Sequence, residues 1–226
     1  MDNMELIRDC ASDATSRVEM WSGFLRRKNI ETFLEIGVYR GDFAKAILSG
    51  RHRLSKYFMI DPWRKLERWN KPMNVSDSEF ESYRREALEK TAFAQDIRHV
   101  LQGTTAEVIE QIEQESVDFA YIDGDHTLNG ITVDLQLVYP RIRDGGWIAG
   151  DDFCSAIWQH SSCYEPTFVF PYAVYFAEAT SSRIYALPHN QFLMQKDSAG
   201  KHEFIDLVGT YGDIAVGKRL LEPNDA

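Results

Sequence analysis

Five short apolar segments separated by helical segments constrain the fold of this chain more than any other feature. A glycine or an acid follows each apolar segment closely, and the five cover residues 32–36, 57–60, 99–102, 117–122 and 147–149. Residues with helical spacing or helix-forming composition lie between them, at 43–48, 76–94, 106–112 and 127–139. Strands that alternate with helices predict a parallel sheet that is covered on both faces.

The two ends of the chain complete this prediction. Residues 4–27 predict one amphipathic helix or two short ones, and residues 172–179 predict a further helix. Residues 182–187 and 191–196 predict an antiparallel pair that closes the sheet. The fold class is therefore expected to be α/β, with a Rossmann-like, doubly wound, seven-stranded and mostly parallel sheet.

The expected domain organisation is simple. An N-terminal helical segment (1–29) precedes a single α/β domain (30–226), without a linker between them. Asp144-Gly145-Gly146 predicts a tight turn. The polar stretch 64–75 is either a loop over a site or a long connection.

Composition excludes several classes of protein. The 226 residues are 44% hydrophobic and 27% charged, which is globular and excludes a disordered chain. A net charge of −10 argues against nucleic-acid binding, and no apolar run approaches the roughly 20 residues that span a bilayer. Three cysteines without C-x-x-C spacing predict neither a disulfide framework nor a thiolate zinc site. Without a recognisable signal peptide, we expect a cytoplasmic location.

Functional residues are expected beyond the carboxyl ends of the strands, where open parallel sheets bind their ligands. Glycines and one threonine follow the first and third strands, and six acids and one histidine stand on the same rim. The candidates are Glu35, Gly37, Gly41, Asp61, Gly103, Thr104, Asp123, Asp125, His126, Asp151 and Asp152.

The loop after the first strand predicts a nucleoside site. Asp61 ends the second strand, twenty residues after Gly41, and can accept hydrogen bonds from ribose hydroxyls. Three residues separate Gly37 from Gly41, which makes a wider turn than the glycine-rich loop of a dinucleotide site. Glu35, beside this turn, would repel phosphate and attract a cation. A nucleoside that carries an amino acid and a sulfonium fits these charges better than a dinucleotide. The alternative is a plain turn with a solvated Asp61.

The acids after the fourth and fifth strands predict a metal site. If those strands are adjacent, the carboxylates of Asp123, Asp151 and Asp152 converge, and a cation or a proton must compensate them. Oxygen ligands favour a hard ion such as Mg²⁺. The alternative is that one or two of these acids cap a helix or face solvent.

Three side chains near this rim have open roles. Asp125 or His126 could take a proton from a substrate hydroxyl. Trp63 either stacks on an adenine ring or packs under the loop. His160 could face the same cleft, although a role outside it is the simpler interpretation.

The motifs resemble those of class I S-adenosylmethionine-dependent methyltransferases. Residues 34–41 (Leu-Glu-Ile-Gly-Val-Tyr-Arg-Gly) resemble their first motif, and residues 60–63 (Ile-Asp-Pro-Trp) resemble their second. Residues 121–126 and 145–153 are similar to those of the macrocin (TylF-like) O-methyltransferases, which belong to methyltransferase domain family 24. The resemblance covers residues 30–155.

The resemblance implies a role for each matching residue. Glu35, Gly37 and Gly41 would border the methionine part of S-adenosylmethionine, and Asp61 its ribose. Gly103 and Thr104 would lie near the adenine. Asp123, Asp151 and Asp152 would hold Mg²⁺, Asp123 also bordering the cofactor. His126 has the spacing of the catechol-type base, and Asp125 that of the base proposed in some macrocin-type enzymes.

The expected function is Mg²⁺-dependent O-methyl transfer to a hydroxyl of a small molecule, such as a sugar or a natural product. Residues 168–174 depart from the pattern of the macrocin-type enzymes in a region that helps to form the acceptor pocket. The resemblance therefore does not identify the acceptor. The alternatives are a metal-independent methyltransferase on nitrogen or oxygen, a nicotinamide-dependent dehydrogenase, and a non-catalytic cofactor-binding protein. We expect no nucleic-acid or membrane partner, and the N-terminal helices could form the contact of a homo-oligomer.

Overall fold

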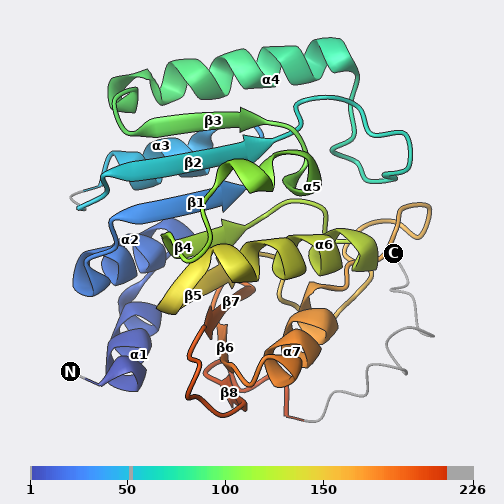
Figure 1. Cartoon of the computed structure of the whole chain (residues 1–226). Coiled ribbons are helices and arrows are strands. Elements are labelled where there is room, and N and C mark those ends of the chain that lie inside the picture. Colours follow the sequence, from blue (N-terminus) through green and yellow to red (C-terminus); the bar gives the residue numbers. More distant parts are fainter. Residues whose placement is uncertain (1, 51–52, 213–226) are drawn as a thin grey trace.

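An eight-stranded sheet forms the centre of the computed structural model, which describes residues 2–50 and 53–212 (Figure 1). The strand order is β3-β2-β1-β4-β5-β7-β6-β8, and the first five strands are mutually parallel. The strands are β1 (Thr32–Ile36), β2 (Lys56–Asp61), β3 (Arg98–Gln102), β4 (Val117–Ile122), β5 (Ile142–Gly150), β6 (Arg183–Leu187), β7 (Gln191–Gln195) and β8 (Glu203–Asp206). The Rossmann-like α/β prediction is confirmed.

The predicted number of strands was one too low. The expected pair β6 and β7 forms and runs antiparallel, but β8 adds a strand parallel to β6 at the edge of the sheet. With four residues and only partial burial, β8 lacks the apolar run that made the other strands visible. The expected turn at 144–146 is also corrected. These residues lie within β5, where a register shift against β4 takes up the extra chain.

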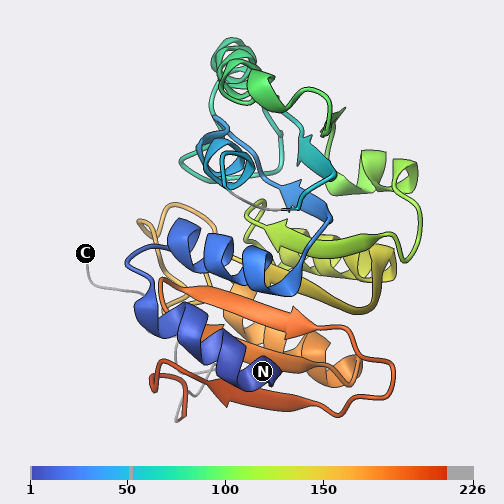
Figure 2. The ribbon, with the colours of Figure 1, turned by 90° about the vertical axis from the view of Figure 1, so that its left-hand side faces the viewer.

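Helices cover both faces of the sheet (Figure 2). They are α1 (Asn3–Asp13), α2 (Arg17–Lys28), α3 (Asp42–Leu48), α4 (Asp77–Lys90), α5 (Thr105–Val108), α6 (Leu128–Val138) and α7 (Val169–Ala179), with short 3₁₀ turns at Ala92–Ala94, Ile109–Gln111 and Tyr139–Arg141. None of the described helices is long and apolar enough to cross a membrane.

Side chains alternate along the strands, so the core consists of two apolar layers. Phe33 and Tyr57 face α1 to α4, whereas Leu34 and Phe58 face α5 to α7. The N-terminal segment forms two helices, and Ser16 caps α2 by accepting a hydrogen bond from the Glu19 N–H. Both helices bury their apolar sides in the first layer.

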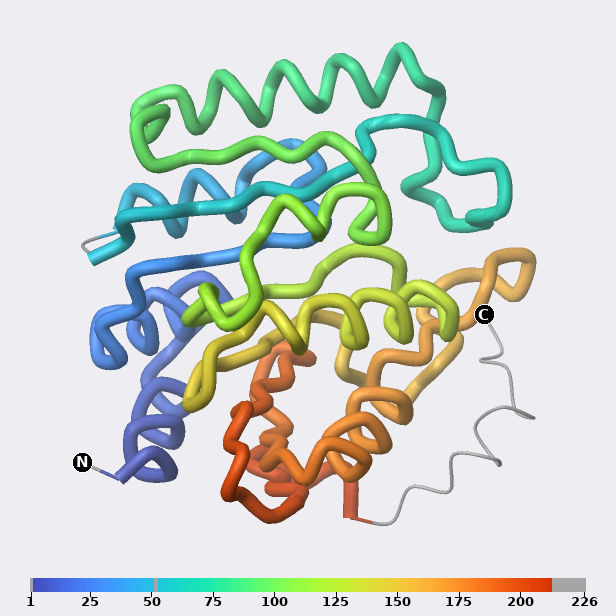
Figure 3. Tube along the Cα trace, viewed as in Figure 1, coloured from blue at the N-terminus to red at the C-terminus, as the bar shows by residue number. Residues whose placement is uncertain are grey.

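The topology brings the carboxyl ends of the parallel strands to one edge. The Cα trace shows two long connections at that edge, one after β2 and one after β5 (Figure 3). The reversal of strand order lies between β1 and β4, which are neighbours in the sheet. A crevice at such a reversal is the usual ligand site of this architecture.

Candidate active site

A cavity of about 500 Å³ lies at the carboxyl ends of the strands. Its size is typical of a small-molecule site. Ten of the twelve predicted site residues line it: Glu35, Gly37, Asp61, Gly103, Thr104, Asp123, Asp125, His126, Asp151 and Asp152. His160 lines it as well, so this histidine does face the cleft.

The loop after β1 passes close to β4. Gly37 has φ +85°, and a Cβ there would lie 1.9 Å from the Asp123 carbonyl oxygen. Only glycine fits both the backbone conformation and the space. The Asp123 N–H donates to the Ile36 carbonyl at 2.8 Å, which fixes the two strand ends against each other.

Gly41 has a different role from the predicted one. It is the N-cap residue before α3 and has φ +75°, and a Cβ there would lie 2.7 Å from the Ala87 Cα. It is not among the residues that line the cavity. Gly41 therefore permits the close packing of α3 on α4, rather than bordering the cavity.

Asp61 holds the backbone around the cavity. Its carboxylate accepts the Tyr39 N–H and the Trp63 N–H, each at 2.8 Å. Burial raises the pKa of Asp61 to about 6, although the backbone hydrogen bonds act in the opposite direction. Asp61 also lines the cavity, so it remains available to a ribose hydroxyl there.

Trp63 packs beneath the loop, which is the second of the two interpretations of its role. The side chain is buried in the apolar layer under the α1–α4 face. Its indole N–H donates to the Tyr39 carbonyl at 2.8 Å. Its neighbours Pro62 and Arg64 line the cavity, and Trp63 does not.

Glu35 is an acid in the interior, and it lines the cavity. The Tyr57 hydroxyl donates to its carboxylate at 2.7 Å. Burial raises the pKa of Glu35 to about 8, and the charges of Asp123 and Asp61 act in the same direction. A cationic ligand in the cavity would stabilise the ionised form of Glu35.

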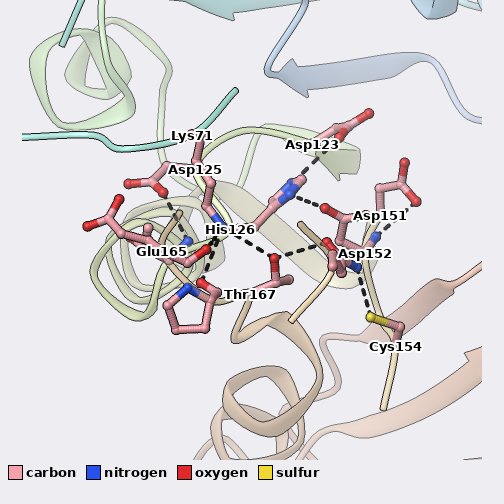
Figure 4. A network of polar contacts seen from close by, with 12 residues as sticks. Lys71, Asp123, Asp125, His126, Asp151, Asp152, Cys154, Glu165 and Thr167 are labelled. Atoms are coloured by element: carbon pink, nitrogen blue, oxygen red, sulfur yellow. Dashed lines mark hydrogen bonds and ion pairs between the residues drawn. The ribbon is translucent and has the colours of Figure 1, made fainter. Parts of the chain in front are cut away.

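Three acids gather at the ends of β4 and β5, as predicted, and we call Asp123, Asp151 and Asp152 the acid rim (Figure 4). Arg17, at the start of α2, forms ion pairs with two of them. Its Nη1 lies 3.0 Å from Asp123 Oδ2 and also contacts Asp151 Oδ2. Asp152 pairs with the Nδ1 of His126 instead.

Both ring nitrogens of His126 face carboxylates. Nδ1 contacts Asp152, and Nε2 lies 3.5 Å from Asp123 Oδ1 (Figure 4). Burial lowers the pKa of His126, but the hydrogen bond to Asp152 and the charges of both acids outweigh it, so the pKa is raised. The two acids therefore stabilise the protonated form of the imidazole.

Asp125 stands at the start of α6. Its Oδ1 accepts the Thr127 N–H at 2.9 Å. A Cβ on Gly130 would lie 2.3 Å from the Asp125 Cγ, so this glycine makes room for the carboxyl group against the first turn of the helix. The carboxylate is thus held in place while it lines the cavity.

The comparisons with known proteins agree with this geometry. Residues 34–153, more than half of the chain, match the family model Methyltransf_24, described as a methyltransferase domain. The chain belongs to this family of methyltransferases. It is a class I S-adenosylmethionine-dependent methyltransferase, as the motifs predicted.

Similar proteins share the fold at low sequence identity. The methyltransferase superposes on a putative caffeoyl-CoA O-methyltransferase from Staphylococcus aureus with a TM-score of 0.59, 13% identity and coverage of 87% of this chain and 93% of the other. An O-methyltransferase from Bacillus cereus in complex with S-adenosylhomocysteine (SAH) gives a TM-score of 0.57 at 15% identity, covering 85% and 88% of the two chains. TomG from Streptomyces achromogenes, an O-methyltransferase in complex with S-adenosylmethionine, gives 0.56 at 12% identity, covering 88% and 91%.

One relative was found by sequence. The uncharacterized protein R132 of Acanthamoeba polyphaga mimivirus is 22% identical over 130 residues. The match covers 56% of the methyltransferase and 53% of the viral protein, so the chain spans about half the length of this relative.

The acid rim of the methyltransferase does not fit the predicted Mg²⁺ in its present arrangement. The guanidinium of Arg17 contacts both Asp123 and Asp151, and Asp152 faces His126. Across residues 2–50 and 53–212, no group of three or more His, Cys, Asp or Glu side chains is arranged to hold a metal ion. The compensating cation predicted for these acids is present, but it is a side chain.

Sequence reasoning missed Arg17, although a signal exists. The positions of Arg17, Trp21 and Phe24 are spaced as one face of a helix, and Trp21 and Phe24 are almost fully buried. An arginine on an apolar helix face needs an acidic partner. The sequence does not say which acids those are, because Asp123 is 106 residues away.

The long connections after β2 and β5 are joined at the cavity. The Asn70 N–H donates to Glu165 Oε2 at 2.8 Å, and the Glu165 N–H donates to the Asn70 carbonyl at 3.1 Å. Buried Lys71 donates to the Glu165 carbonyl at 2.6 Å (Figure 4). The stretch 64–75 therefore forms part of the cavity wall, and Lys71 is a lining residue that the sequence did not single out.

Proposed function

We propose that this methyltransferase transfers the methyl group of S-adenosylmethionine to a hydroxyl oxygen of a small molecule, of the sugar or natural-product type. The observation that carries the proposal is the position of Asp125. This carboxylate lines the same cavity as the cofactor candidates Glu35 and Asp61. A proton acceptor and a site for a cationic nucleoside therefore share one cavity.

The cofactor side of the cavity has the groups that S-adenosylmethionine requires. Glu35 can ionise opposite its cationic groups, Asp61 offers an acceptor to its ribose, and the glycine at 37 lets the backbone approach. Gly103 and Thr104 form the wall after β3, where an adenine is expected. When bound, the cofactor supplies a methyl group on a positively charged sulfur.

On the acceptor side, the geometry favours Asp125 over His126 as the base. Nδ1 of His126 contacts Asp152, whereas Nε2 has no hydrogen-bond partner and lies 3.5 Å from Asp123. The two acids raise the pKa of His126 and so favour the protonated ring, which cannot take up a further proton. Asp125 can accept the hydroxyl proton while Thr127 and Gly130 hold its carboxyl group in place. Holding the hydroxyl oxygen in line with the methyl group supplies much of the remaining acceleration.

Two further observations support a small hydroxylated acceptor. The connections joined through Asn70 and Glu165 restrict the space beside the cavity. The structural neighbours include two named O-methyltransferases, one in complex with S-adenosylhomocysteine and one with S-adenosylmethionine.

The test separates cofactor binding from transfer. Titration calorimetry should show S-adenosylmethionine binding to the wild type and to Asp125→Asn with equal affinity. On a panel of sugars, catechols and polyketide glycosides, formation of S-adenosylhomocysteine should fall by about 10²–10⁴-fold in Asp125→Asn, the range for loss of a general base.

Asp96→Asn, at an exposed acid before β3, is the matched control and should keep full activity. The proposal is wrong if the wild type methylates amines but no hydroxyl on matched panels, or if Asp125→Asn transfers methyl groups as fast as the control.

A further inference from the structure

Arg17 is built into the fold between two acids of the acid rim. Its Nη1 contacts Asp123 and Asp151 and donates to the Tyr121 hydroxyl at 3.3 Å. The guanidinium also lies over the Phe43 ring, 5.6 Å from its centre. Four elements, α2, α3, β4 and the end of β5, therefore meet at this one side chain.

The partners of Arg17 are themselves fixed by a buried glutamine. Gln191 Oε1 accepts the Tyr121 hydroxyl and the Trp21 indole N–H, each at 2.9 Å. Its Nε2 donates to Asp151 Oδ1 at 2.5 Å. Because Gln191 is fully buried, the orientation of the Asp151 carboxylate is determined before any ligand arrives.

The charges of the rim are balanced by side chains. Asp123 and Asp151 share Arg17, and Asp152 faces His126. An arginine stays protonated at any physiological pH and cannot dissociate from its site as a metal ion can. With 35% of its side chain exposed, Arg17 also lines the cavity, so its positive charge faces the space for the acceptor.

We propose that Arg17 is the resident cation of the acid rim, in the place where the sequence motifs predict a divalent ion, and that this enzyme needs no added divalent ion. Arg17 acts through Asp123 and Asp151, so it is a positioning residue. The claim about turnover rests on the function proposed above, whereas the claim about the cation site does not.

Metal binding tests the site without any acceptor. Mn²⁺ is the probe, and its free concentration is followed by electron paramagnetic resonance. The wild type and Arg26→Ala, a control for an exposed arginine on the same helix, should bind no stoichiometric Mn²⁺. Arg17→Ala should bind one ion, because it leaves Asp123 and Asp151 without their cation. Adding Asp151→Asn to Arg17→Ala should remove that ion.

Two outcomes would overturn the proposal. One is a wild type that binds one Mn²⁺ ion and loses it on Asp151→Asn. The other is a folded Arg17→Ala that binds none, which would mean that the arginine does not stand in an ion's place. Circular dichroism and thermal unfolding check folding, and Arg17→Lys keeps the positive charge if the alanine variant is unstable.

Turnover provides the second arm. The rate of the wild type should be unchanged by EDTA. Arg17→Ala should lose on the order of 10–100-fold in kcat, the range for groups that orient active-site ligands, with unchanged affinity for S-adenosylmethionine. Arg17→Lys should recover part of the loss. A wild type inactivated by EDTA and restored by Mg²⁺ would refute the metal-independent reaction, whereas absence of any transfer would refute only the proposed function.

Discussion

The acidic side chains in the two halves of the cavity are held in place by different kinds of contact. In the cofactor half, formed by the ends of β1 to β3, the acids Glu35 and Asp61 are held by residues within 22 positions along the chain. Asp61, for example, accepts N–H groups from Tyr39 and Trp63, in its own loop and in the neighbouring one. In the acid rim, side chains distant in sequence hold the acids, since Arg17 pairs with Asp123 from 106 residues away. Short motifs can predict the first kind of contact, but not the second.

The largest expected effect is a loss of stability on substitution of a residue at the contact between the two halves of the cavity. Gly37→Ala should destabilise the fold by about 3–5 kcal/mol, because the new Cβ would overlap the Asp123 carbonyl oxygen at 1.9 Å and φ is +85°. Denaturant unfolding measures this change. Gly209→Ala is the control, since Gly209 has φ +77° but no atom within 4 Å of the added carbon. Equal losses of stability in the two variants would show that the close contact between the two halves does not exclude a side chain at position 37.

The next effect concerns Glu35 and pH. Because burial raises its pKa to about 8, the folded state keeps a proton that the unfolded chain loses above about pH 4.5. Stability should therefore fall as pH rises from about 4.5 to 8, and the ionised carboxylate should cost on the order of 5 kcal/mol above that window.

Glu35→Gln should remove this part of the pH dependence and be more stable than the wild type at pH 8. The measurement is denaturant unfolding at several pH values, with Glu31→Gln, at an exposed acid before the same strand, as the control. An unchanged pH profile in Glu35→Gln would show that the acid is not held neutral. Added S-adenosylmethionine should reduce the difference, because its positive charge favours the ionised Glu35.

The smallest effect separates the halves by function. Asp61→Ala should weaken S-adenosylmethionine binding roughly tenfold to hundredfold, since it removes a charged acceptor, while the Arg17 contacts persist. Asp151→Asn should leave this affinity unchanged. Calorimetry gives both affinities. If Asp151→Asn weakens cofactor binding as much as Asp61→Ala does, the division into two halves is wrong.

Much of the fold could be predicted because its signals are local. The strands β1 to β4 and the pair β6 and β7 carry apolar runs, so their bounds came out within a residue or two. β8 was missed because it is short and half-exposed at the edge. The turn predicted at 144–146 was wrong, because glycines also mark the irregular pairing of β5 with β4.

The sequence predicted which residues belong to the site better than it predicted the role of each residue. The strand ends fixed which side chains line the cavity, so Glu35, Asp61, Asp123 and their neighbours were found. Gly41 shows why roles are harder to predict. A glycine is needed at this position because Ala87, on another helix, lies close to it, and no short motif contains that information.

The contact between Gly37 and the Asp123 carbonyl has a consequence for anyone who redesigns this enzyme. The nucleoside-facing loop and the strand that presents the first acid share a single backbone junction, with no side chain between them to absorb a shift. Grafting a new acceptor pocket from a relative would therefore succeed only if the loop from 37 to 41 is transferred together with it.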